Sequence, residues 1–126
     1  MRAVDTSAWI EFLAGSQLAE AVGNALPAPG EWLVPTIVQM ELAKWARRES
    51  AAEKAEQLIA FTTTCVVVDL TTEIAIFAAE ICARHKLATA DAIIYATALT
   101  YEADLLTCDR HFEGLPGVCY FPKAAG

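Results

Sequence analysis

The sequence has no apolar run long enough to cross a membrane and no early segment typical of a secretory signal. The longest stretch without a charged residue runs from Gln57 to Val68, whereas a transmembrane helix needs about 18 or more apolar residues. Asp5 places a carboxylate too early for a signal peptide. Apolar residues still make up 56% of the 126 residues, which is ample for a hydrophobic core. We therefore expect one globular domain, residues 1–126, that is cytoplasmic and makes no membrane contact.

Cysteine and histidine are also scarce. The four cysteines include no C-x-x-C pair, and the two histidines, His85 and His111, are too scattered for a typical zinc centre. His111 is therefore expected in a loop rather than as a metal ligand. Because unpaired cysteine is among the most buried residue types, we interpret the cysteines as buried free thiols. They are Cys65, Cys82, Cys108 and Cys119.

Basic residues are few, with nine Lys and Arg against sixteen Asp and Glu, and the net charge is −7. Proteins that bind nucleic acids neutralise phosphates with Lys and Arg, so this balance argues against such a function. The total charge ignores where the acids lie, however, because carboxylates that bind divalent metal ions reverse the local charge. The positions of the acids therefore matter more than their number.

Short apolar segments alternate with amphipathic ones along the chain. We expect strands at residues 2–4, 31–34, 65–68, 104–107 and 118–121, with Pro35 ending the second strand. Helices are expected at about residues 6–14, 17–26, 36–48, 51–61 and 90–101, and residues 25–30 form a loop. A further helix has an apolar stripe formed by Ile74, Phe77, Ala78, Ile81 and Cys82. This alternation predicts an α/β fold with a mostly parallel central sheet and helices on both faces.

Three helix starts carry capping signals. Thr6 or Ser7 is expected to cap the first helix. Thr36 is followed three positions later by Gln39, and the two together are typical of a capping box. Thr89 is expected to cap the helix over residues 90–101.

Four acidic residues lie at positions where an α/β fold places its ligands. Asp5 directly follows the first expected strand, and Asp109 follows the strand over residues 104–107. Ligands in such folds bind beyond the carboxyl ends of the strands. Asp91 lies at the start of a nearly apolar helix, and Glu41 lies on the helix after the second strand. Each acid alone is equally consistent with a turn, a cap or a favourable helix dipole.

Taken together, the four acids are harder to explain structurally. Asp91 has few polar neighbours in its helix, and no group of Lys or Arg accompanies the acids in the sequence. A buried acid without a partner is costly, so such groups are usually paired or bound to metal. Ligation by carboxylate oxygens suits Mg²⁺ or Mn²⁺ better than zinc. The pattern therefore predicts a divalent-metal site.

The segments that carry these acids match a known pattern along the whole chain. They are Val4-Asp-Thr-Ser-Ala8, Glu41, Ala88-Thr-Ala-Asp-Ala-Ile-Ile-Tyr-Ala-Thr-Ala98 and Leu106-Thr-Cys-Asp-Arg-His-Phe112. In order and spacing they resemble a PIN domain, and more narrowly the VapC toxins of bacterial and archaeal toxin–antitoxin pairs. The one departure is the opening Ala88-Thr-Ala90, where Gly is frequent in the family, and it affects packing rather than chemistry.

The resemblance implies an α/β/α sandwich that acts as a metal-dependent endoribonuclease. In-line attack on the phosphodiester at such a metal site is expected to leave 5′-phosphate and 3′-hydroxyl ends. Ser7 and Thr107 match hydroxyl positions beside the first and last acids, where they would support the acids or orient water. The family also implies a homodimer and a cognate VapB-type antitoxin that inserts a basic or aromatic segment into the acidic cleft. The acidic quartet that holds Mg²⁺ or Mn²⁺ would be Asp5, Glu41, Asp91 and Asp109.

Basic residues near two of these acids are candidates for RNA contacts. Lys44, Arg47 and Arg48 lie at i, i+3 and i+4 on the helix that carries Glu41, and Arg110 is adjacent to Asp109. An equally open interpretation is that they are solvated, or that they pair with acidic neighbours such as Glu49 and Glu53.

Trp9 and Trp45 could stack on RNA bases, because aromatic side chains often recognise RNA in this way. Packing in the core or in an interface is the favoured interpretation for both, since aromatic residues dominate such packing.

Other functions use a similar fold. A phosphoryl-receiver domain would take Asp69 as its acceptor but leaves Glu41 and Asp91 without a role. A haloacid-type phosphatase needs an acid two positions after Asp5, where Ser7 stands. A PIN fold that binds RNA or a protein partner without cleaving stays open as the alternative.

Overall fold

The computed structural model describes residues 1–49 and 52–123. Over these residues the strands are β1 (Arg2–Val4), β2 (Trp32–Pro35), β3 (Val66–Val68), β4 (Asp104–Thr107) and β5 (Val118–Tyr120). The α-helices are α1 (Thr6–Leu13), α2 (Ala19–Ala25), α3 (Thr36–Glu49), α4 (Ala52–Thr62), α5 (Thr72–His85) and α6 (Thr89–Thr100). Two short 3₁₀ helices are η1 (Pro29–Glu31) and η2 (Arg110–Phe112). Apart from η1 and η2, these elements are the expected ones, and the boundaries given for them differ by at most two residues.

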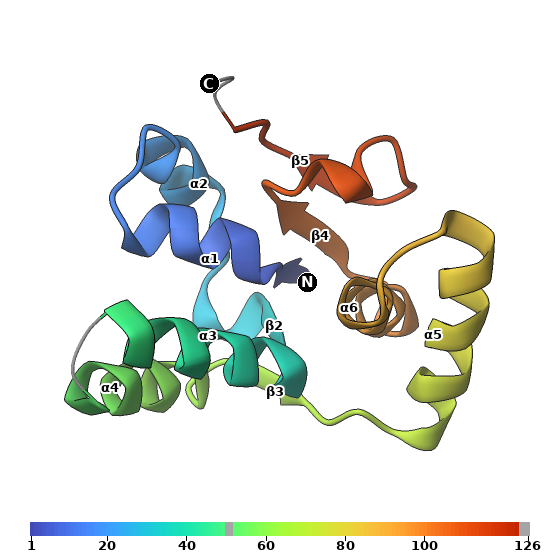
Figure 1. Ribbon diagram of the computed structural model, residues 1–126, viewed down its shortest axis with the longest axis horizontal. Helices are drawn as coiled ribbons and strands as arrows, with labels where there is room; N and C mark the ends of the chain where they lie inside the picture. Colours follow the sequence, from blue (N-terminus) through green and yellow to red (C-terminus); the bar gives the residue numbers. More distant parts are fainter. Residues whose placement is uncertain (50–51, 124–126) are drawn as a thin grey trace.

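The five strands form one sheet in the order β3-β2-β1-β4-β5, and every neighbouring pair is parallel. Helices α1 to α4 lie on one side of this sheet and α5 and α6 on the other (Figure 1). The predicted α/β/α layering is therefore confirmed. The chain leaves β1 toward β2 and returns later to β4, so the carboxyl ends of β1 and β4 flank the point where the strand order reverses. Ligands in open α/β sheets bind at such points.

The core lies on both faces of the sheet. Strands β1, β2 and β4 are buried at almost every position, because helices cover both of their faces. On α5 the expected apolar stripe faces inward, with Ile74, Ala78 and Ile81 buried. Tyr95 of α6 is also buried, and its hydroxyl donates a hydrogen bond of 2.6 Å to the carbonyl of Pro116. This bond fixes α6 against the segment that precedes β5.

The predicted helix caps are wrong in each case. Asp5, not Thr6 or Ser7, is the N-cap residue of α1, although its side chain makes no capping bond. Ala88, not Thr89, is the N-cap residue of α6.

The expected capping box is also absent. Thr36 is already the first residue of α3, and the side chain of Gln39 donates to the Thr62 hydroxyl at 3.0 Å. Gln39 therefore joins α3 to α4 instead of capping its own helix.

Two further expectations need correction. Pro35 is the last residue of β2 and pairs with Val68, so it does not lie beyond the strand. Of the four cysteines only Cys108 is buried; the other three are partly exposed, and all four are free. The helix expected from residue 51 begins at Ala52, and residue 51 itself lies outside the described residues.

No helix in the described part of the chain is long and apolar enough to span a membrane.

Candidate metal centre

The four predicted acids line one pocket of about 310 Å³ at the carboxyl ends of β1 and β4. Asp5 directly follows β1, and Asp109 lies two residues after β4. Glu41 comes from the second turn of α3, and Asp91 from the first turn of α6. Residues far apart in sequence thus converge on the reversal point of the sheet, as the sequence predicts.

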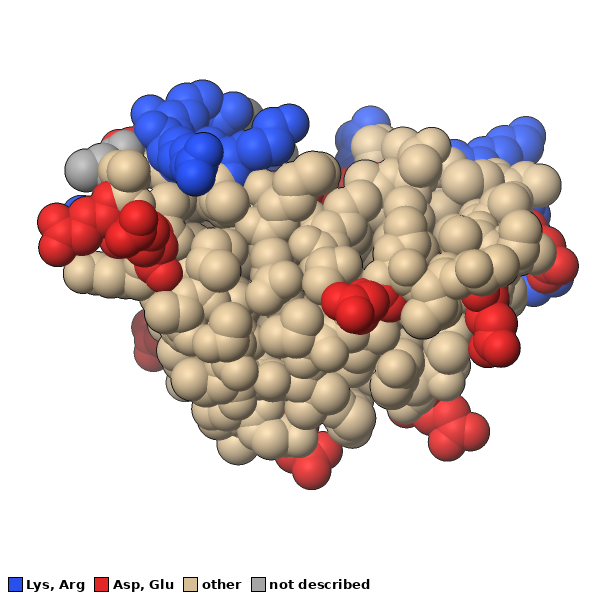
Figure 2. Space-filling view, turned by 90° about the horizontal axis from the view of Figure 1, so that it is seen from below, with Lys and Arg blue, Asp and Glu red and all other residues tan. Residues whose placement is uncertain are grey.

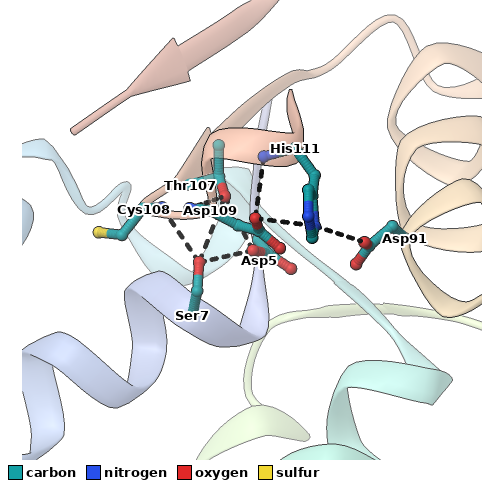
Figure 3. Close-up of polar contacts among 7 residues, drawn as sticks. All are labelled: Asp5, Ser7, Asp91, Thr107, Cys108, Asp109 and His111. Carbon is teal, nitrogen blue, oxygen red and sulfur yellow. Dashed lines mark hydrogen bonds and ion pairs between the residues drawn. The ribbon is translucent and has the colours of Figure 1, made fainter. Parts of the chain in front are cut away.

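Asp5 is the most deeply buried of these acids, with 3% of its surface exposed. Its Oδ2 atom accepts hydrogen bonds from the hydroxyls of Ser7 at 2.6 Å and Thr107 at 2.8 Å. Each hydroxyl in turn accepts a backbone N–H at 3.0 Å, Ser7 from Cys108 and Thr107 from Asp109 (Figure 3). The two hydroxyls therefore hold the carboxylate in one orientation, as expected for supporting residues. Within residues 1–49 and 52–123 nothing donates to Oδ1, which stays available to a ligand.

A separate hydrogen bond positions Glu41. The Thr6 hydroxyl, in the first turn of α1, donates to Glu41 Oε1 at 2.6 Å. This bond links α1 to α3 at the edge of the pocket. Thr6 was expected to cap a helix, but its hydroxyl instead holds the Glu41 carboxylate in place.

His111 lies beside two of the acids and belongs to the short 3₁₀ helix η2, whereas a loop residue without a ligand role was expected. Its backbone N–H donates to Asp109 Oδ1 at 2.9 Å. Its Nδ1 atom lies 3.2 Å from Asp109 Oδ1 and 3.8 Å from Asp91 Oδ2 (Figure 3). One ligand atom from each of these three residues lies within 4.8 Å of the others, a spacing suited to one metal ion. The Asp-x-His spacing in the sequence is the signal that could have found it.

Burial and repulsion from neighbouring acids make Asp5 and Asp91 more difficult to ionise. Burial raises the pKa of Asp5, opposed by the hydrogen bonds from Ser7 and Thr107 and reinforced by repulsion from Asp109 and Glu41. Burial, followed by repulsion from Asp5 and Asp109, raises the pKa of Asp91 to about 6.

In the described part of the chain no Lys or Arg forms an ion pair with any of the four acids. A divalent cation would relieve both the repulsion and the cost of burial. Oxygen donors, one available oxygen on Asp5 and the lack of a Lys or Arg ion pair among the described residues fit Mg²⁺ or Mn²⁺.

Two further residues, Glu11 and Lys123, line the pocket but were not predicted from the sequence. Glu11 lies on α1 one turn beyond Ser7, so helical spacing could have found it. Lys123 follows β5, and no local pattern relates it to the acids. Burial raises the pKa of the Cys108 thiol to about 11, with Glu11 raising it further and Lys123 opposing. Both charges therefore act at the same side of the pocket.

The candidate RNA contacts are distributed unevenly around the acids. Lys44 and Arg48 line a second hollow of about 210 Å³, which shares Thr6, Ile10 and Glu41 with the acidic pocket. Arg47 is exposed but lines neither hollow, and Arg110 is exposed on η2.

The alternative of local ion pairing holds in part for one of these residues. Arg48 Nε lies 3.5 Å from Glu49 Oε1, and both side chains are largely exposed. Figure 2 shows a dense group of Lys and Arg side chains over the part of the molecule where α3 and α4 lie in Figure 1. The molecule is therefore basic at one place despite its acidic total.

A third, larger hollow is apolar. It has a volume of about 590 Å³ and lies between α1, α3 and α4. Trp9 forms part of its floor, 3% exposed, with its ring centroid 4.6 Å from that of Trp32. The packing interpretation of Trp9 is thus confirmed. Trp45 is half-buried and lines both this hollow, called the apolar groove below, and the hollow that contains Lys44 and Arg48, called the basic hollow. The lining residues are Trp9, Phe12, Leu13, Leu26, Trp32, Trp45, Ala46, Lys54, Gln57, Leu58 and Phe61.

Comparison with known proteins gives one matching family model and several solved structures with a similar fold. The PIN domain family model matches residues 2–118. A toxin–antitoxin complex from Klebsiella pneumoniae contains a similar chain, with 25% identity, a TM-score of 0.82, and coverage of 94% of this chain and 96% of that one.

Two further structures share the fold at lower identity. VapC20 of Mycobacterium tuberculosis, described as a toxin that cleaves the sarcin-ricin loop, is 21% identical with a TM-score of 0.74, over 94% of this chain and 97% of that one. A chain of FitAcB from Neisseria gonorrhoeae is 20% identical with a TM-score of 0.75, over 96% of both chains. No curated protein matches the sequence.

Proposed function

The chain belongs to the PIN domain family, and from this premise we propose that it is a metal-dependent endoribonuclease, the toxin of a type II toxin–antitoxin pair that acts in the cytoplasm. The observation that carries the proposal is the convergence of Asp5, Glu41, Asp91 and Asp109 on one pocket without a Lys or Arg ion pair among the described residues. A site of this kind would bind a divalent cation, which would relieve the repulsion among its carboxylates.

The four acids would hold Mg²⁺ or Mn²⁺. When bound, such an ion supplies Lewis acidity, which stabilises negative charge on phosphate oxygens and lowers the pKa of a coordinated water. Asp5 would anchor the ion through its free Oδ1, while Ser7 and Thr107 keep the other oxygen occupied. Thr6 would do the same for Glu41. Hydrogen bonds of this kind keep the carboxylates in position, which reduces the reorganisation needed when the ion and RNA bind.

Asp109 and His111 lie on the more open side of the pocket, with side chains 27% and 69% exposed. We assign Asp109 to orient the attacking water or to support a second ion. In-line attack by water on the phosphodiester would break the bond to the 3′-oxygen and leave a 5′-phosphate and a 3′-hydroxyl. The RNA 2′-hydroxyl takes no part in this scheme, so a cyclic 2′,3′-phosphate on the product would contradict it.

RNA would approach from the basic side of the molecule. We assign Lys44, Arg47, Arg48 and Arg110 to phosphate contacts. All four are exposed; Lys44 and Arg48 line the hollow beside the acidic pocket, Arg47 lies on the same helix, and Arg110 follows Asp109. Non-specific affinity for RNA derives mainly from such contacts and falls with salt.

The apolar groove is the reason to propose a protein partner. Phe12, Leu13 and Phe61 line it and are each about 40% exposed, and an apolar surface of this kind marks an interaction site. Structures with this fold include toxin–antitoxin complexes. We therefore propose a cognate VapB-type antitoxin as the partner, together with a homodimeric state, which light scattering of the purified chain would test.

The decisive experiment is cleavage of pooled cellular RNA by the chain freed of any antitoxin, in Mn²⁺ or Mg²⁺, with sequencing of the new ends. Asp91→Asn is the matched control because it keeps the size of the side chain and removes the charge. Discrete 5′-phosphate ends from the wild type alone would support the proposal and identify the target. RNA binding without cleavage would favour the alternative of a PIN fold that binds RNA but does not cut it.

A further inference from the structure

The basic hollow beside the acidic pocket has the properties of a nucleotide-binding subsite. Lys44, Trp45 and Arg48 line it together with Thr6, Ile10 and Glu41. The last three also line the acidic pocket, so the two hollows adjoin each other. Glu41 lies at their boundary, held in place by the Thr6 hydroxyl at 2.6 Å.

One stripe of α3 produces the change from acidic to basic character. Glu41, Lys44, Trp45 and Arg48 follow one another at i, i+3, i+4 and i+7, which places them on one face of the helix. Over this stripe the helix advances about 10 Å, at about 1.5 Å per residue. A single helix face thus presents a metal-binding carboxylate, an aromatic ring and two cations in sequence.

Trp45 is suited to contact a base. Its side chain is half-buried and separates the basic hollow from the apolar groove, whereas Trp9 and Trp32 are buried and stack on each other. A ring that is anchored on one side and open on the other can stack on a base with little loss of side-chain freedom.

The cations beside Trp45 are available for phosphate. Lys44 is exposed and makes no ion pair within the described ranges, and the exposed contact of Arg48 with Glu49 is of a kind that contributes little. Base stacking and phosphate contacts together are the means by which proteins hold single-stranded RNA.

We propose that this hollow binds the nucleotide adjacent to the scissile phosphate, with its base stacked on Trp45 and the neighbouring backbone held by Lys44 and Arg48. The substrate class that follows is single-stranded or looped RNA, because a base within a duplex is stacked on both faces and cannot reach the tryptophan. The proposal rests on the nuclease function, since the scissile phosphate lies in the acidic pocket.

The first test measures RNA binding separately from cleavage. In an Asp91→Asn background, anisotropy is measured with a short fluorescein-labelled RNA without self-complementarity and with the same RNA annealed to its complement. Trp45→Ala should weaken binding of the single strand about tenfold, and Trp45→Phe should restore most of the loss. The duplex should bind more weakly and be insensitive to both changes.

The cations are tested through salt dependence. Lys44→Gln with Arg48→Gln should reduce the slope of log affinity against log salt by about 1.4, at about 0.7 per phosphate contact on a single strand. Arg84→Gln with Lys86→Gln is the matched control. It removes the same charge at the end of α5, on the opposite side of the sheet, and should leave the slope nearly unchanged.

The second test uses the wild-type protein and the RNA whose cut site has been mapped. An abasic nucleotide on one side of the cut should slow cleavage about tenfold, and the same replacement should have no further effect in Trp45→Ala. If Trp45→Ala retains the wild-type melting temperature and binds single-stranded RNA as tightly as the parent, the subsite is refuted. An equal change of slope in the Arg84 and Lys86 control refutes the assignment of the cations.

These outcomes separate the two proposals. Absence of cleavage by the wild type, with binding that still depends on Trp45, would refute the nuclease function and leave an RNA-binding site. Cleavage that is indifferent to Trp45, Lys44 and Arg48 would refute the subsite and leave the nuclease intact. Unchanged RNA affinity with lost affinity for the partner protein would assign this face to that partner and overturn the inference.

Discussion

Strands β1 and β4 carry charged side chains at both ends, and the two ends are arranged in opposite ways. At the amino end, Arg2 donates to both carboxylate oxygens of Asp104, each at 2.9 Å, and also to the carbonyl of Ala25. At the carboxyl end, Asp5 and Asp109 lie together with further acids and without a Lys or Arg ion pair in the described ranges.

The comparison separates two uses of charge on the same pair of strands. The amino end is satisfied by the protein itself, and the hydrogen bond from Arg2 to Asp104 raises the pKa of Arg2. At the carboxyl end burial and repulsion are compensated only in part, and the pKa values of Asp5 and Asp91 are raised as a result. The first arrangement stabilises the fold. The second leaves repulsion between carboxylates that a cation from solution would relieve.

The largest expected difference between the two ends is in cleavage. Asp5→Asn should reduce the rate of RNA cleavage by more than about 100-fold, because even residues that only support metal ligands contribute about 10–100-fold. Asp104→Asn, the matched change at the amino end, should leave the rate within twofold of wild type, about 0.4 kcal/mol in activation free energy. Equal losses in both variants would show that the effect comes from the fold and not from the site.

Metal binding should show the same contrast through stability. At about 100 times its dissociation constant, Mg²⁺ or Mn²⁺ should stabilise the chain by about 2.7 kcal/mol, or roughly 10 °C in melting temperature for a domain of this size. Calorimetry with and without the ion measures the shift. It should persist in Asp104→Asn and disappear in Asp5→Asn; a shift of equal size in both variants would place the ion elsewhere.

The pH dependence of the metal-free protein should reveal the repulsion at the carboxyl end. The pKa of Asp91 is about 6 in the folded chain against an ordinary 3.8, so the folded state holds its proton more tightly than the unfolded state. Stability due to this group is therefore complete below about pH 4, falls as the pH rises toward 6, and stays low above it.

Asp91→Asn removes that loss. In urea titrations the variant should match the wild type near pH 4 and exceed it by about 1 kcal/mol at pH 7, a figure discounted for the partial exposure of the side chain. The difference between the two proteins should change mainly between pH 4 and 6. A variant less stable than wild type at pH 7 would contradict the view that this carboxylate is held at a cost.

The smallest effect is expected at the amino end. Asp104→Asn breaks a pair whose side chains are 27% and 41% exposed, so it should cost less than about 1 kcal/mol of unfolding free energy. Its sign is nevertheless opposite to that of Asp91→Asn at pH 7. Chemical denaturation of both variants in one buffer measures the two signs directly, and destabilisation by both would remove the distinction between the ends.

The fold could be predicted because its signals are local. Strands buried on both faces are continuously apolar, and the stripe of α5 has helical spacing, so the alternation and the parallel sheet follow from the sequence. The helix caps could not be predicted in the same way, because tertiary partners compete for the capping side chains. The Thr6 hydroxyl bonds to Glu41, and the Gln39 amide bonds to Thr62.

The sequence likewise predicted part of the candidate site, namely the acids but not all of their neighbours. Asp5 and Asp109 follow strands whose carboxyl ends must lie at one edge of a parallel sheet, so their proximity follows from topology. His111 approaches Asp91 only because η2 turns back over the pocket, and Lys123 reaches it only because the chain returns after β5. Such approaches depend on the path of loops, which leaves no periodic trace in the sequence.

The pairing of β1 with β4 also determines when the site comes into existence during synthesis. Val4 is in register with Leu106, and Asp5 is held by the hydroxyl of Thr107, about a hundred positions later in the chain. A nascent chain that has not yet released β4 from the ribosome lacks Thr107, which holds Asp5, and Asp109 itself. The acidic pocket is therefore complete only after most of the chain has been translated.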